Sequence, residues 1–588
     1  MSRPRRNSSA AYALSMFIGK RPAFNWKRTA FFLAGALTVI AVSTMGTQAN
    51  QVWAAALKPG IPTNTTPVTI GEPTAFSGAF LPYLSSSAST NFVVEQQFGS
   101  LLHLRQNLAV APELVAKWWY ESNGQRLYMQ LSKNAVWSDG TPITSADIGL
   151  AVNFLASPVY NNQLLGTQGY RVLPIVGSRA VMAGQAQTVA GFHAVNGSEF
   201  YFQLRAPDPS ALVRDFAGMM PLPAAVLGSI PYASWPTSQF AADPDVGSGP
   251  FLISSSGGAQ VDLTANRKFV LGIPKLQNFI VRVATSAVLP GLLHAGEIDL
   301  YSGVSPSLAA EASHIAGYRV MSTAGNGYTF LGWKDNLPGY GSVAFRRAVE
   351  YAINRKALIS SVFGGQATLE NGPLPPDSMW YNAALNNVYP YQPQTARNLL
   401  MSAGFHIGPK LWIVQPGGQP LGAAIAYAQG DPYGKQEATA IVNDLRAIAV
   451  DASVGPALSP RQMIYDLQSN PPAIQGYVMG WQFGVDPNPA DLWSANAMYN
   501  IDTVNWTNTA DAAVAANNSL IAEQESAAAT NTATRQQILN KWQALVSQNA
   551  PENFLVDPNL LGVQSTRLQG VVWSGAQGPI DSWKWTVS

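Results

Sequence analysis

Apolar and polar positions alternate along this chain with two different periods. Residues 127–131 and 199–204 alternate one by one, which predicts half-buried strands. Residues 345–359 instead carry apolar side chains at i, i+3, i+4 and i+7, which predicts an amphipathic helix or a pair of helices. Further helices are expected at 92–104, 395–403, 437–449 and 535–546. Strands and helices follow one another irregularly, so the pattern predicts a mixed α/β fold.

Two short motifs mark local structure. Asp139-Gly140 predicts a turn, and Thr144 is a good N-cap that Asp147 completes as an acidic capping box. The helix that begins there is expected to run to about Ala156. Residues 247–249, Gly-Ser-Gly, predict a tight turn that enters a strand. No helix with Lys-Ser/Thr follows this turn, which argues against a phosphate-binding loop.

The N-terminal region has the three parts of an export signal. Residues 1–28 contain seven basic and no acidic side chains, the apolar run Phe31–Val42 follows, and small residues stand at Ala54–Ala56. The uncharged stretch around this run is also long enough for an uncleaved membrane anchor. We therefore expect a signal peptide or N-terminal anchor at 1–56 and a Pro- and Gly-containing linker at 57–66. Both alternatives place the body outside the cytoplasm, in a periplasm or at the cell surface.

Composition narrows the function further. Charged residues make up only 12% of the 588 residues, and removing the basic N-terminal region changes the formal net charge from +2 to −5. A mildly acidic body argues against nucleic-acid binding. The chain has no cysteine, which excludes disulfides, thiolate metal sites, a cysteine nucleophile and a lipid-modified cysteine. The low charge content also suits an acidic exterior, because few carboxylates are then lost by protonation.

The residues that carry chemistry form no recognisable catalytic or metal-binding motif. The five histidines are not paired at metal-ligand spacing, and neither H-E-x-x-H nor G-x-S-x-G occurs. Asp139, Asp147 and Asp299 have structural explanations as turn, cap and strand-entry residues. We therefore expect no catalytic residues, no cofactor and no metal site. The five histidines are His103, His193, His294, His314 and His406.

Five segments stand in an order that is typical of one family. They are Trp137–Ile148, Gly247–Phe251 with Leu263–Arg267, Ala295–Asp299, Phe345–Ile359, and Gly480-Trp481 with Asp486-Pro487. Together they resemble the family 5 bacterial extracellular solute-binding proteins, the peptide- and nickel-binding receptors of ABC importers. The resemblance covers roughly Pro67 to Val587.

The resemblance implies a two-lobed, periplasmic-binding-protein-like clamp of the type II, large-cleft class, with an extra subdomain inserted in lobe I. Two strands would cross between the lobes, near Ser322 and Glu552, and the ligand would lie between the lobes. The implied parts are 67–90 (lobe I, first part), 91–214 (inserted subdomain), 215–321 (lobe I, second part), 322–551 (lobe II) and 552–588 (return to lobe I).

The function implied is an extracytoplasmic receptor that delivers oligopeptides or peptide-like solutes to the permease subunits of an ABC importer. We expect a monomer that is not an enzyme, with membrane association through the N-terminus as one possibility. Three alternatives stay open: the same fold binding an oligosaccharide or a metal chelate, a surface chaperone or adhesion module, and a secreted hydrolase.

The segment after Met479 supplies the first candidate ligand contacts. Peptide-binding relatives often carry an acidic residue shortly before the Asp-Pro step, where it pairs with the ligand's α-amine. Here Gln482, Phe483, Gly484 and Val485 occupy that interval, so an N-blocked peptide, a cyclic peptide or an oligosaccharide suits the segment as well as a free-amine peptide. Asp486 either substitutes for the missing acid or fixes a turn. Trp481 either stacks on the ligand or fills lobe II.

Three further candidates come from two other loops. Asn326 and Tyr328 lie just after the first expected crossing, where the neighbouring glycines permit close backbone approach. The alternative is a turn on the hinge side. Tyr83 closes the loop Phe76–Tyr83, which matches the family's first cleft loop in position. The expected lining is thus aromatic and amide-rich and suits a polar, weakly charged ligand.

Overall fold

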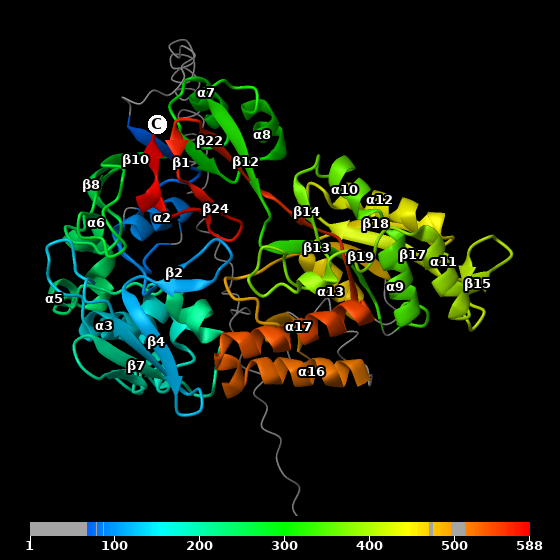
Figure 1. Cartoon of the computed structure of the whole chain (residues 1–588), viewed down its shortest axis with the longest axis horizontal. Coiled ribbons are helices and arrows are strands. Elements are labelled where there is room, and N and C mark those ends of the chain that lie inside the picture. The colour runs from blue at the N-terminus through cyan, green and yellow to red at the C-terminus, as the bar shows by residue number, and fades with distance from the viewer. Residues whose placement is uncertain (1–66, 78, 86, 336, 470–473, 495–511) are drawn as a thin grey trace, which may run out of the picture. The chain divides into compact units, whose positions relative to one another are not determined.

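The computed structural model describes residues 67–77, 79–85, 87–335, 337–469, 474–494 and 512–588. The expected signal peptide or anchor at 1–56 and the expected linker at 57–66 lie outside the described residues. Two larger sheets organise the described part of the chain (Figure 1).

Lobe I is built on a seven-stranded mixed sheet. Its spatial order is β12-β22-β11-β1-β10-β9-β8. Strand β1 runs parallel to β10 and β11, and the other neighbours are antiparallel. The strands are β1 (Val68–Glu72), β8 (Phe251–Gly257), β9 (Gln260–Ala265), β10 (Asn278–Val283), β11 (Leu300–Ser302), β12 (Tyr318–Thr323) and β22 (Leu560–Ser565).

Lobe II is built on a five-stranded mixed sheet of order β18-β17-β19-β13-β20. The strands are β13 (Gly327–Trp333), β17 (Gly422–Ala428), β18 (Asp451–Leu458), β19 (Gly476–Gln482) and β20 (Glu552–Phe554). The predicted helix pair is confirmed as α9 (Val343–Ala352) and α10 (Arg355–Ser361). The apolar stripe of α9, from Phe345 to Ala352, is buried in the lobe II core.

A separate four-stranded sheet lies within the range expected for the inserted subdomain. Its order is β4-β5-β7-β6, from β4 (Val115–Glu121), β5 (Arg126–Leu131), β6 (Phe192–Ala194) and β7 (Glu199–Gln203). The expected capping box opens α3 (Ser145–Ala156), where the Asp147 carboxylate accepts the Thr144 N–H at 2.7 Å. The limits of the subdomain stay a prediction.

The chain passes twice between the two large sheets. The first passage joins β12 to β13 through residues 324–326, next to Ser322. The second runs from β21 (Val556–Pro558) into β22. Glu552 belongs to the lobe II sheet, so this second passage lies beyond it. Strand β21 pairs with β14 (Ala367–Leu369), which ties the passage to lobe II.

One predicted helix differs from the structure. Residues 92–104 do not form a single helix: α2 spans Ala88–Gln97 and β2 spans Leu102–Leu104. The helix ends because the Gln97 carbonyl accepts the N–H groups of Ser248 and Gly249, both at 3.0 Å, in place of a helical partner. The Leu101 N–H donates to the Met219 carbonyl instead, so contacts distant in sequence override the local pattern.

The remaining elements connect these sheets. The helices are α4 (Ser178–Met182), α5 (Ala224–Leu227), α6 (Gln239–Ala242), α7 (Leu289–His294), α8 (Pro306–Ala312), α11 (Pro393–Ser402), α12 (Gly434–Ala447), α13 (Pro460–Gln468), α14 (Ala490–Trp493), α16 (Ala512–Gln524) and α17 (Thr532–Asn549). The short strands are β3 (Val110–Pro112), β15 (His406–Ile407), β16 (Ile413–Val414), β23 (Leu568–Gln569), β24 (Val572–Ser574), β25 (Gly578–Ile580) and β26 (Thr586–Val587). Within the described ranges, no helix is long and apolar enough to cross a membrane.

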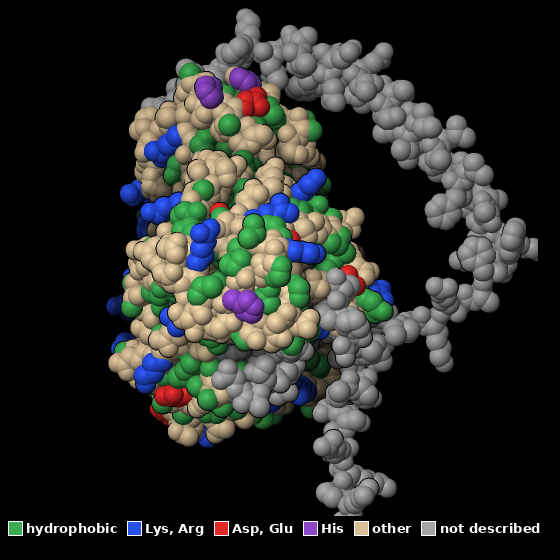
Figure 2. All heavy atoms as spheres, turned by 90° about the vertical axis from the view of Figure 1, so that its right-hand side faces the viewer, with side chains coloured by type: hydrophobic (Ala, Val, Ile, Leu, Met, Phe, Trp, Pro, Cys, Tyr) green, Lys and Arg blue, Asp and Glu red, His purple; other side chains and the backbone are tan. Residues whose placement is uncertain are grey.

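The low charge content is visible on the surface. Figure 2 shows a face on which scattered Lys and Arg side chains and few acidic ones lie among uncharged residues.

Several carboxyls are buried instead. Burial raises the pKa of Glu437 to about 8, against a hydrogen bond from Thr329, and raises the pKa of Asp557 to about 8, with the charge of Asp377 adding to the effect. Burial also raises the pKa of Asp335 to about 7, although Arg346 opposes it.

We predict that the protein melts at a higher temperature at pH 5 than at pH 8. A carboxyl with a raised folded-state pKa contributes stability that is fully present below its unfolded pKa, near 4, and is lost as the pH rises through the folded value. For Glu437, Asp557 and Asp335 this stabilising contribution is lost by about pH 7 to pH 8. The pKa values of Asp139 and Asp581 are lowered instead, so these two carboxyls stabilise the folded protein when they are ionised. Their contribution is lost only as the pH falls to more acidic values. Calorimetric melts across this range measure the difference.

Glu437→Gln provides the matched variant, because the Gln carbonyl can still accept the hydrogen bond that the Thr329 hydroxyl donates at 2.8 Å. We expect its melting temperature at pH 8 to rise by a few degrees and its value at pH 5 to change little. A wild-type protein that melts at a lower temperature at pH 5 than at pH 8 would contradict the prediction.

Candidate ligand-binding site

The end of the β13–β19 ladder brings together most of the predicted contact residues. Tyr328 lies opposite Trp481, and Gly327 lies opposite Gln482. The Asn326 side-chain amide donates to the carbonyls of Phe483 at 2.9 Å and Gly484 at 3.1 Å, and the backbone carbonyl of Asn326 accepts the Phe483 N–H at 2.8 Å. Asn326 therefore fixes the chain as it leaves β19, which explains why an amide side chain suits this position.

These residues differ in how much of each side chain a ligand can reach. Trp481 and Phe483 are half-buried and Gln482 is exposed. Tyr328 is 1% exposed, its hydroxyl donates to Glu552 at 3.3 Å, and its ring packs against Phe483 with a centroid distance of 5.6 Å. A small cavity of about 140 Å³ is lined by Trp481, Gln482, Phe483 and Asp486, among others. The buried Tyr328 thus supports this segment by packing against it, whereas the side chains of Trp481 and Phe483 keep some accessible surface.

Asp486 is held by Arg535. Its carboxylate accepts two guanidinium hydrogen bonds, at 2.6 and 2.8 Å, and the side chains of both residues are almost fully buried. The same guanidinium donates to the Ser210 hydroxyl of lobe I at 2.7 Å and to Gln524, and it lies 4.7 Å from the centroid of the Trp380 ring. The structure therefore gives Asp486 a structural partner that the sequence pattern did not indicate.

We predict that Asp486→Asn costs about 3–5 kcal/mol of unfolding free energy, because Arg535 would keep a buried charge without its carboxylate. Glu297→Gln is the matched control, since its ion pair with Arg282 is about one-third exposed on both sides and should contribute at most about 1 kcal/mol. Urea denaturation measures both variants. If Asp486→Asn instead abolished ligand binding at unchanged stability, Asp486 would be a ligand anchor.

Tyr83 lies elsewhere, in the wall of a larger cavity of about 480 Å³ in lobe I. Its hydroxyl donates to the Met220 carbonyl and accepts the Met220 N–H, both at 2.7 Å, and its backbone has a left-handed φ of 71°. Burial raises the pKa of the Tyr83 phenol. The Tyr83 hydroxyl is thus already occupied by partners within the protein.

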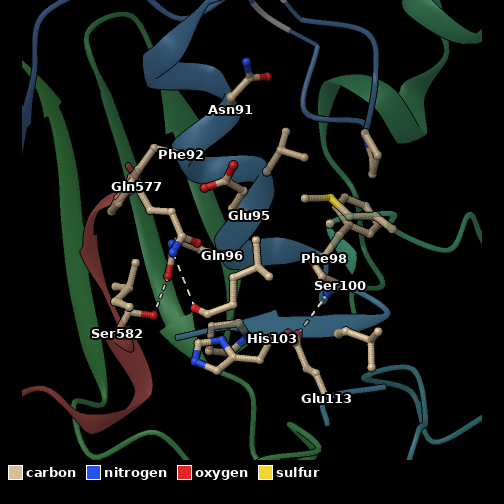
Figure 3. Close-up of a pocket in the computed structure, with 18 of the residues that line it drawn as sticks. Asn91, Phe92, Glu95, Gln96, Phe98, Ser100, His103, Glu113, Gln577 and Ser582 are labelled. Atoms are coloured by element: carbon tan, nitrogen blue, oxygen red, sulfur yellow. Dashed lines mark hydrogen bonds between the residues drawn. The ribbon is translucent and has the colours of Figure 1, made fainter. Parts of the chain in front are cut away.

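The larger cavity is built from segments that are far apart in sequence. Helix α2, the β2–β3 hairpin and the C-terminal segment 576–583 contribute lining residues (Figure 3). Residues 168–171 and Val485, from the loop after β19, also line this cavity. This loop is the one that carries Phe483 and Asp486. The loop after β19 therefore contributes lining residues to both cavities.

The cavity contains ionisable side chains that the sequence patterns did not indicate. Burial raises the pKa of Glu95 to about 7, opposed by Arg171, and raises the pKa of Glu113 to about 7, opposed by His103 and by a hydrogen bond from the Ser100 N–H. Asp581 lies 3.1 Å from the His103 imidazole. One signal did exist in the sequence, since Glu95 is the only charged residue in the ten residues of α2.

The Asp581 carboxylate lies beside two basic side chains, His103 and Lys584. Desolvation works against its charge, but hydrogen bonds from His103 and Lys584 outweigh it, so the pKa of Asp581 lies below its usual value. Lys584 lies 2.7 Å from the Asp581 carboxylate, and the Trp583 ring packs edge-on against His103. In the part of the chain that the structure describes, no group of three or more His, Cys, Asp or Glu side chains is arranged to hold a metal ion.

The family follows from comparison with known proteins. The model for bacterial extracellular solute-binding proteins, family 5 Middle, matches residues 109–537, and the chain therefore belongs to this family. The chain is also similar to a protein of Brucella melitensis named as an ABC transporter peptide-binding protein, with 25% identity over 538 residues that cover 88% of this chain and 92% of the relative. The family resemblance inferred from the five sequence segments is confirmed.

Solved structures confirm the two-lobed α/β fold. The oligopeptide-binding protein AppA from Bacillus subtilis, in complex with a nonapeptide, aligns with a TM-score of 0.55 at 18% identity and covers 90% of this chain and 100% of its own. NikZ from Campylobacter jejuni, in complex with Ni(L-His), aligns with a TM-score of 0.59 at 19% identity and the same coverage. The family is extracellular, in agreement with the expected location of the body.

Proposed function

We propose that this protein is the solute receptor of an ABC importer and that it delivers an oligopeptide or a peptide-like solute to the permease subunits. The observation that carries the proposal is a cavity of about 480 Å³ in lobe I that is completed by Val485 from lobe II, in a chain of the solute-binding family. A ligand that reached from this cavity to Trp481 would contact both lobes and favour their closure.

The lining favours a peptide on chemical grounds. Trp481 and Phe483 offer aromatic faces, Gln482 offers a side-chain amide, and the larger cavity adds Tyr83 and ionisable groups. Such a site can stack on side chains and pair with backbone amides. Asn326, Tyr328 and Asp486 would act indirectly, by holding the segment that carries the contacts. The relatives named for peptide binding support the same ligand class.

We further propose that binding proceeds without turnover and that the protein works as a monomer. The proposal rests on membership of a solute-binding family. Export through the basic and apolar N-terminal region, followed by cleavage or by membrane anchoring, completes it. N-terminal sequencing of protein from fractionated cells separates a cleaved from an anchored form, and a cytoplasmic pool with an intact N-terminus would contradict export.

We predict that a pool of peptides of three to nine residues raises the melting temperature of the purified protein. A ligand at a hundredfold excess over its Kd contributes about 2.7 kcal/mol to the stability of the folded state. Trp481→Ala should weaken this binding by about tenfold or more, since an accessible aromatic contact is lost. Tyr465→Ala is the control, because Tyr465 is 69% exposed and lines neither cavity.

The same thermal-shift screen includes oligosaccharides and metal chelates. Native mass spectrometry of protein purified from its host provides an independent identification of the ligand. If a saccharide or a chelate shifts the melt and no peptide does, the peptide assignment fails and the receptor assignment stands. Hydrolysis of any of these compounds would contradict both.

A further inference from the structure

The smaller cavity, of about 140 Å³, is lined mainly by apolar side chains. Four of its lining side chains are at most 3% exposed, and they come from three separate segments of lobe II: Leu374, Leu492, Trp493 and Trp542. Trp481 and Phe483 line the same cavity and are half-buried. The cavity therefore combines a buried apolar wall with two aromatic side chains that a ligand can reach.

The polar groups of this cavity are already paired within the protein. Asp486 is the one charged residue among the lining residues that the structure describes, and Arg535 donates two hydrogen bonds to it. The Asn488 side-chain carbonyl accepts the Gln524 amide at 2.6 Å, and the Asn488 amide donates to Glu525 at 3.2 Å. A charged ligand group that entered here would lose its water without gaining a counter-ion, whereas an apolar group gains from leaving water.

The volume of the cavity suits a single side chain of moderate size. An engineered apolar cavity of about 150 Å³ in another protein takes up benzene, whereas one water molecule accounts for about 30 Å³. A cavity of about 140 Å³ is therefore large enough for a phenyl ring or a branched aliphatic group. The rings of Trp493 and Trp542 already meet edge-on in the wall, at a centroid distance of 5.9 Å, and aromatic rings pack favourably in this geometry.

The position of the cavity lets a ligand occupy both cavities at once. Phe483, Gly484 and Asp486 line the smaller cavity, and Val485, between them in the sequence, lines the larger one. Consecutive Cα atoms are about 3.8 Å apart, so a ligand that contacts Val485 lies within a residue or two of the smaller cavity. Gln482 lines the smaller cavity as well, and its exposed amide can pair with a peptide group of the ligand.

We propose that the smaller cavity is a specificity site that accepts one phenyl-sized or branched aliphatic side chain of the ligand. The inference rests on the proposed function and makes it more specific: the peptide-like ligand carries an apolar side chain such as Phe or Leu. This side chain packs against Trp481, Leu374 and Leu492, and the remainder of the ligand extends past Val485 into the larger cavity. Shape and desolvation, rather than an ion pair, select the ligand.

Hexapeptides of Gly, Ala and Ser with one guest residue test the proposal. The guest is Ala, Leu, Phe, Trp, Lys or Glu, and it is placed at each position in turn. Peptides retained by the purified protein are released and quantified by mass spectrometry. We expect Leu and Phe guests to be retained at least tenfold over Ala, because a hydrophobic pocket discriminates by about tenfold or more for a single methylene. Lys and Glu guests should not exceed Ala.

Two substitutions of Leu374 separate the cavity from the accessible face of Trp481. Leu374→Phe places a larger side chain in the cavity and should reduce the preference for Leu and Phe guests to less than twofold. Leu374→Ala enlarges the cavity and should shift the preference toward the Trp guest. An effect of the Trp481 surface alone would leave both preferences unchanged, since neither substitution alters that side chain.

Leu539→Ala is the matched control for the loss of a buried leucine. Leu539 is fully buried in the same apolar cluster as Leu374 and lines neither cavity. Both alanine variants leave a void in this cluster, so both should melt below the wild type. Leu539→Ala should nevertheless keep the wild-type preference among the guest residues, and its melting transition verifies that it is folded.

The outcomes distinguish this inference from the proposed function. Retention that does not depend on the guest residue, or a preference that is unchanged in both Leu374 variants, overturns the specificity site and leaves the peptide receptor intact. Retention of no peptide with any guest overturns the peptide assignment, and the specificity site with it.

Discussion

Arg535 links three segments that lie far apart in the sequence, and the geometry of the candidate site depends on it. The guanidinium pairs with Asp486, donates to Ser210 of lobe I and lies over the Trp380 ring. A buried cation is tolerated only when its donors are satisfied, so these partners must be in place together. The loop between β19 and α14, which carries Phe483 and Val485, is thereby fixed at one end by Arg535 and at the other by Asn326.

This arrangement separates the residues that shape the site from those that a ligand can reach. Tyr328, Asn326 and Asp486 use their polar atoms within the protein, and Trp481 and Gln482 keep accessible surface. A receptor that must close over its ligand needs both kinds: contacts presented at a defined angle, and a rigid second layer that does not reorganise when the ligand enters.

Burial also affects the charge state of several carboxyls in this protein. Glu437 and Asp557 lie within lobe II and at the passage between the lobes, where burial raises the pKa of each carboxyl. Such groups contribute most to stability when they are neutral, which suits an exterior more acidic than the cytoplasm. The acidic exterior that the sequence suggested from its low charge content and its lack of cysteine stays a prediction.

Local sequence patterns determined the elements whose contacts are close in the chain. The capping box at Thr144 and the apolar stripe of α9 were predictable because a helix start and a helical face each depend on residues three or four positions apart. The five segments in order also identified the family, and with it the two-lobed fold. The extent of α2 was not predictable, because the turn at 244–249 takes over its terminal hydrogen bonds. The same physical reason applies to the site: Asp486 is paired with a residue 49 positions away, and the larger cavity forms only where α2, β2, residues 168–171 and the C-terminal segment meet. Pairing and desolvation are properties of position in three dimensions, and only the tertiary structure decided them.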